Sequence, residues 1–120
     1  MLKTALLVLT LTDDGATRVT LSEQAGAEDC ALARTTGTAI LTRSGRPPLA
    51  AVCGETGLRL TPFEHGAAPE TEVNRYRVEL PASGGFTVAP LAGGAACTPE
   101  PEATPVVHCG RSAQKVLAGD

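Results

Sequence analysis

Residues 4–12 read TALLVLTLT, with leucine and valine on both alternating sides, and the predicted architecture follows from this pattern. Successive side chains of a β-strand point to opposite faces, so a strand with one face in water is apolar on the other face only. A strand that is apolar on both faces is typical of one that is covered on both sides. We therefore predict a central, largely buried strand over residues 4–12.

The N-terminus also imitates a secretory signal, because Met1-Leu2-Lys3 precedes this apolar run. The run is only about eight residues long, and Asp13-Asp14 follows it without an Ala-x-Ala cleavage site. It is also far shorter than the ~20 residues that cross a bilayer. We interpret it as an integral strand, and we predict no membrane span and a cytoplasmic location.

Outward from this strand, the pattern changes from hairpin to helix. Residues 13–16 (DDGA) are turn formers, and residues 17–23 (TRVTLSE) alternate as a strand does, which predicts a β-hairpin. Residues 25–44 then carry a stripe of small and apolar residues at helical spacing: Cys30, Ala33, Gly37, Ile40 and Leu41. Gly45 and Pro47-Pro48 end the predicted helix, whose stripe we expect to face a sheet.

Strand patterns recur beyond the helix. They cover residues 49–53, 58–63, 73–80, 86–91 and, as a short C-terminal strand, 106–109. A turn at residues 54–57 predicts that the first two of these form a second hairpin. The sequence thus predicts one α+β domain over residues 1–120, with the order β-β-α-β-β-β-β plus the C-terminal strand. We expect the helix to pack on one face of a largely antiparallel sheet.

Composition limits the classes of function. The chain is 42% hydrophobic and 19% charged, as a packed protein is. A net charge of −3 and only three aromatic side chains weigh against nucleic-acid binding, which needs a surplus of cations. Arg34, Arg43 and Arg46 form the one basic concentration, which we interpret as the solvated end of the helix. Eight of the ten basic residues are arginine, which is typical of a GC-rich, bacterial genome.

Four cysteines are the most informative residues: Cys30, Cys53, Cys97 and Cys109. They lie 23, 44 and 12 residues apart, so the C-x(2-4)-C knuckles of zinc sites and the C-x-x-C of redox proteins are absent. We favour buried thiols in a reducing cytoplasm and keep two alternatives. One is disulfides in an oxidising compartment such as the periplasm, pairing Cys30 with Cys53 and Cys97 with Cys109. The other is a metal site.

The usual catalytic residues are poorly placed. His65 lies in a polar loop, and His108 directly precedes Cys109, so on a strand the two would point to opposite faces. The sequence contains no G-x-S-x-G elbow and no phosphate-binding glycine motif. We therefore predict no catalytic, cofactor-binding or metal-ligating residue and no cofactor.

These observations favour a non-enzymatic interaction or accessory protein, acting on an unknown protein partner or by self-association. The first alternative is a small-molecule binding module with its pocket between helix and sheet. An enzyme of unknown class is the second alternative.

Overall fold

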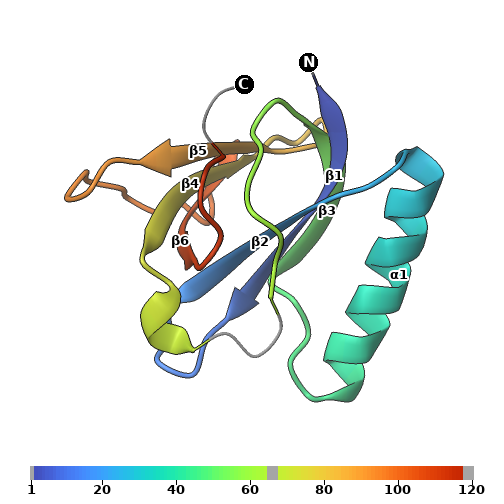
Figure 1. The fold of residues 1–120 in the computed structure, drawn as a ribbon, viewed down its shortest axis with the longest axis horizontal. Helices are drawn as coiled ribbons and strands as arrows, with labels where there is room; N and C mark the ends of the chain where they lie inside the picture. The colour runs from blue at the N-terminus through green and yellow to red at the C-terminus, as the bar shows by residue number, and fades with distance from the viewer. Residues whose placement is uncertain (1, 65–67, 118–120) are drawn as a thin grey trace.

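The computed structural model describes residues 2–64 and 68–117, which form one curled six-stranded sheet with a single α-helix beside it (Figure 1). The elements in chain order are β1 (Lys3–Leu11), β2 (Thr17–Glu23), α1 (Ala27–Arg43), β3 (Ala50–Thr56), the 3₁₀ turn η1 (Pro69–Thr71), β4 (Asn74–Leu80), β5 (Thr87–Leu91) and β6 (Val106–Ser112). The strand order is β3-β1-β2-β6-β4-β5, and all neighbours are antiparallel except the pair β2 and β6. The predicted α+β class with a largely antiparallel sheet is confirmed.

Strand β1 lies between β2 and β3 and is buried on both faces. Leu7, which is completely buried, belongs to the main core. Leu6, only 6% exposed, points the other way and lies opposite Cys53 in the β1–β3 ladder, on the side where α1 packs. The two-sided apolar pattern of residues 4–12 therefore has its predicted physical cause.

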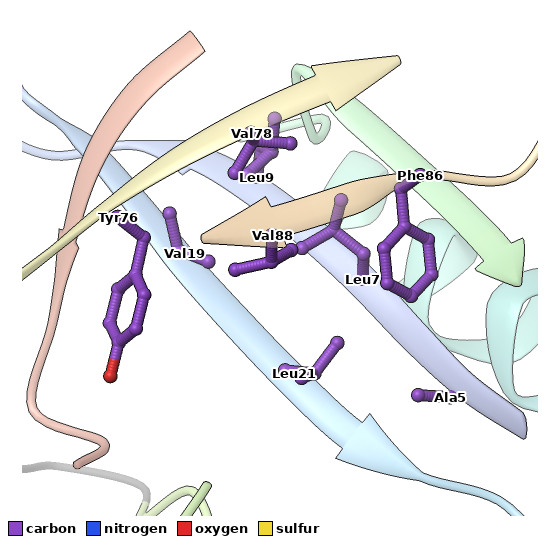
Figure 2. Close-up of a cluster of buried hydrophobic side chains, with 9 residues drawn as sticks. All are labelled: Ala5, Leu7, Leu9, Val19, Leu21, Tyr76, Val78, Phe86 and Val88. Atoms are coloured by element: carbon purple, nitrogen blue, oxygen red, sulfur yellow. The ribbon is translucent and has the colours of Figure 1, made fainter. Parts of the chain in front are cut away.

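The sheet curls around its core, so that strands from both ends of the order contribute to it. Figure 2 shows the side chains that meet there: Ala5, Leu7, Leu9, Val19, Leu21, Tyr76, Val78, Phe86 and Val88. At one end of the curl the Phe86 ring lies 3.0 Å from the position that a Cβ on Gly54 would take. Glycine at position 54 thus lets β3 and the start of β5 approach each other. Among the described residues no ladder joins these two strands, so the curled sheet does not close into a barrel.

The side chain of Gln114 ties together the segments that cover one end of the core. Its Nε2 donates to the carbonyls of Leu21 (2.8 Å) and Thr61 (2.7 Å), and its Oε1 accepts from the Leu21 N–H (2.9 Å). The buried Tyr76 hydroxyl donates to the Gln114 carbonyl at 2.7 Å, and burial raises the pKa of Tyr76. One amide therefore satisfies backbone groups of β2 and of the segment after β3 at once.

The strand expected at residues 58–63, and with it the second hairpin, is wrong. This segment makes only an isolated bridge, between Leu60 and Val116, and otherwise crosses the end of the core, where Leu58 and Leu60 pack. The physical reason is that Leu58 and Leu60 pack against the end of the core, which this segment reaches by leaving the edge of β3 after Thr56. β3 pairs with β1 over its whole length, and its other edge takes no strand among the described residues.

The helix forms where it was expected, but the predicted stripe is wrong at one position. Cys30 is buried and Ala33, Gly37 and Leu41 are half-buried, whereas Ile40 is 57% exposed. Each residue turns a helix by about 100°, so around α1 Leu41 lies about 20° from Cys30 and Ile40 about 80°, at the margin of this narrow contact. The end of α1 is as predicted: Gly45 has a φ of +83°, and the N–H groups of Gly45 and Arg46 bond back into the last turn.

We expect Leu7→Ala to lower the free energy of unfolding by about 2–5 kcal/mol, because it removes a fully buried side chain and leaves a cavity. Leu11→Ala is the matched control on the same strand, where Leu11 is 55% exposed, and should cost less than about 0.5 kcal/mol. Urea unfolding of both variants measures the difference. Equal losses would contradict the assignment of the inner face of β1.

Candidate interaction surface

All four cysteines form disulfides, so the alternative of disulfide bonding holds and the expectation of buried thiols is corrected. Cys30 is joined to Cys53 and Cys97 to Cys109, with Cα atoms 6.1 and 6.0 Å apart. This is the pairing that the sequence favoured for the oxidised state. The first bond fastens α1 to β3, and the second fastens the loop of residues 97–105 to β6.

The two disulfides indicate an oxidising environment rather than the cytoplasm expected from the sequence. The physical reason is that the fold brings each pair of sulfur atoms into bonding geometry, which spacing along the chain cannot reveal. No helix within residues 2–64 and 68–117 has the length and apolar character to cross a membrane.

An open groove runs between α1 and β3. Its volume is about 710 Å³, and Ala51 of β3 forms its floor. The wall on α1 consists of Arg34, Thr35, Thr38, Ala39, Thr42 and Arg43. The groove exists because Cys30 is the only residue of α1 that is fully buried, so the helix rests on the sheet along a narrow line (Figure 1).

The groove runs beside an unpaired sheet edge. Within the described residues β3 pairs with β1 alone, which leaves the backbone N–H and C=O groups of its outer side without a strand partner. The opposite edge strand, β5, carries Pro90, a residue that blocks strand addition. Residues 50–54 of β3 (AAVCG) hold neither proline nor charge, so this part of the edge, before Glu55, lacks the residues that usually protect edge strands.

The three arginines of the basic group have different surroundings. Arg46 makes an exposed ion pair with Asp13, as a solvated residue at a helix end does. Arg34 and Arg43 line the groove and have no ion-pair partner among the described residues. All three residues are exposed, as the interpretation as a solvated helix end expects, and Arg43 stands in the last turn of α1. Arg34 and Arg43 in addition give the groove a positive wall.

A second charged cluster, which sequence patterns did not predict, lies on the outer face of the sheet. The Glu72 carboxylate, whose side chain is 5% exposed, accepts from Arg18 and from Arg111 Nε (3.3 Å). Arg111 also donates to Asp14 at 3.0 and 3.1 Å. A hollow of about 490 Å³ adjoins this cluster. Because these cations are already matched by carboxylates of the chain, we interpret the cluster as structural.

The histidines lie apart from the groove or outside the described residues. His108 lies opposite Val78 in the β4–β6 ladder and so shares its inner face, and burial lowers the pKa of its imidazole. Cys109 points to the other face and is bonded to Cys97, which agrees with the expected opposition of the two side chains. His65 falls outside the described residues.

Comparison with protein-family models, with curated proteins and with solved structures found no match for this chain.

Removing the Asp14 carboxylate tests the structural role of the outer cluster. Hydrogen bonds from Thr12 and Arg111 lower its pKa from the ordinary 3.8 to about 2. A lowered pKa in the folded state stabilises the fold above pH 3.8, and this contribution is lost as the pH falls toward 2. Asp14→Asn should therefore melt below the wild type at pH 6 and approach it near pH 2. A difference in melting temperature between Asp14→Asn and the wild type that stays the same at every pH would contradict this role.

The Cys30–Cys53 bond should be the main constraint on α1. A Cys30→Ala/Cys53→Ala variant loses a loop closure of 23 residues, worth about 3 kcal/mol. We expect faster amide hydrogen exchange throughout α1, because the helix buries little else. The Cys97→Ala/Cys109→Ala variant is the control and should leave exchange in α1 unchanged. Unaltered exchange in the first variant would show that packing alone holds the helix.

Proposed function

We propose that this chain is a non-enzymatic interaction protein that binds another polypeptide along the groove between α1 and β3. The observation that carries the proposal is an unprotected, unpaired edge strand beside an open groove with a positive wall. An added strand would gain main-chain hydrogen bonds from β3, while α1 would contact its side chains. The groove's open shape suits an extended or flat partner better than an enclosed small molecule.

A specific observation also favours the small-molecule alternative, at a different place. A hollow of about 520 Å³ lies at the C-terminal end of α1, where Leu11, Leu41 and Leu49 line it together with Arg46. Leu11 and Leu49 are about half exposed there. If this hollow binds an apolar ligand, an environment-sensitive apolar dye should bind the wild type and fail to bind Leu49→Asp.

We propose further that the oxidising environment is a bacterial periplasm. The arginine-rich composition supports a GC-rich bacterial host, and the two disulfides support an oxidising compartment. Thiol labelling of the chain after rapid acid quenching of native cells, combined with cell fractionation, tests this. Labelled cysteines in a cytoplasmic fraction would contradict it.

A pair of edge variants tests the interaction. Ala51→Lys places a charge on the β3 edge beside the groove, and Ala89→Lys places the same charge on the β5 edge. We expect in-cell cross-linking to yield the same cross-linked species for the wild type and Ala89→Lys, and to lose it for Ala51→Lys. Circular dichroism melts establish that both variants are folded.

Two outcomes would overturn this proposal. One is a cross-linked species that persists in Ala51→Lys, which would place the contact elsewhere. The other is that cells carrying His108→Ala behave as cells without the protein do, while cross-linking is unchanged. That result would favour an enzyme.

A further inference from the structure

We propose that the occupant of the α1–β3 groove is a second copy of this chain, joined about a two-fold axis that pairs β3 with β3 and α1 with α1. This inference rests on the proposed function, because it names the partner for the same surface. It follows from three properties of that surface: the symmetry of the strand edge, the direction of α1 and the distribution of charge along α1.

An antiparallel strand edge is complementary to a copy of itself. In a two-fold interface residue i of one copy meets residue j of the other, and the reverse contact is made at the same time. The backbone groups of β3 can pair in this way wherever the edge is open. Gly54 has the Phe86 ring on its inner face, and the charged Glu55 follows it, so the part of the edge without charge is the first half of β3, residues 50–53. The axis would then pass near Ala51 and Val52.

The helix runs opposite to β3. Its first turns are tied to the middle of the strand through Cys30 and Cys53, and its last turns lie beside the chain just before the strand, where Leu41 and Leu49 line one hollow. A two-fold axis that sets β3 antiparallel to its copy therefore also sets the two α1 helices antiparallel, side by side on one face of a continuous sheet. Antiparallel neighbours place helix dipoles in a favourable arrangement.

The charges on the exposed side of α1 suit this arrangement. Glu28 and Asp29 lie in the first turn, and Arg43 lies in the last. A shallow hollow that includes Glu28 continues into the groove at Thr35, so the acidic end and the basic wall lie on one side of the helix. In the two-fold arrangement the acidic end of each helix meets the basic end of its copy. The threonines and alanines between these ends are small enough for two helices to approach closely.

The measurement is the mass of the oxidised chain by sedimentation equilibrium across a range of concentrations and salt. We expect twice the chain mass of 12.2 kDa, with Ala51→Lys monomeric and Ala89→Lys dimeric. A species that remains dimeric in Ala51→Lys would overturn the proposed interface. A wild type that is monomeric at every concentration would overturn the dimer, while the edge variants in cells would still test the proposed function separately.

Charge reversal tests the antiparallel helices independently. Glu28→Arg and Arg43→Glu should each raise the dimer dissociation constant about tenfold, because each homodimer then holds two like-charge contacts. An equimolar mixture of the two variants should regain wild-type affinity, since both contacts in the mixed dimer are of opposite sign. Failure of the mixture to recover would overturn the arrangement.

The alternative occupant is an extended acidic peptide bound to Arg34 and Arg43. The probe is a glutamate-rich peptide of about ten residues, titrated against the wild-type chain at a concentration at which sedimentation shows it to be monomeric. Micromolar binding that Ala51→Lys abolishes, together with a monomeric wild type, would assign the groove to a peptide and overturn the second copy.

Discussion

Burial of β1 on both faces is the constraint on which the rest of the structure depends. Leu7 and its neighbours on one face belong to the core of the curled sheet, while Leu6 on the other face lies on the side covered by α1. The strand also pairs with β2 and β3 along its length. Since α1 contacts only β1 and β3 closely, the groove exists only while β1 holds both layers together.

The two halves of the sheet share one apolar core, and polar contacts reinforce the short ladder between β2 and β6 that joins them. β2 and β6 meet at a single parallel bridge, between Arg18 and Arg111, and both arginines bind the buried Glu72 carboxylate. Gln114 adds its bonds to Leu21 on the other side of the sheet. Hydrogen bonds to charged groups are stronger than neutral ones, and such contacts fix one arrangement where a short ladder alone would allow others.

Local patterns in the sequence were sufficient for what depends on neighbouring residues. The two-faced strand, the first hairpin, the helix and its Gly45 end all follow from periodicity and turn chemistry. Contacts between distant segments could not be predicted. Nothing near residue 58 shows that the chain will leave the sheet and cross the end of the core, and Gln114 and Glu72 are ordinary polar residues until the fold surrounds them. The groove lies between a helix, which local patterns predicted, and an open strand edge, which depends on contacts between distant segments and was not predicted.

The Cys30–Cys53 bond explains how a helix can stand beside a sheet without a large buried face. Apolar burial would otherwise have to hold α1, and a wider apolar stripe would draw the helix over β3 and close the groove. A covalent bond supplies about 3 kcal/mol with one buried residue, so the wall of small and basic side chains stays exposed. For the proposed addition of a second chain to β3, the partner would not have to order α1 first, because the disulfide already holds the helix. Preorganisation of this kind would lower the entropic cost of that association.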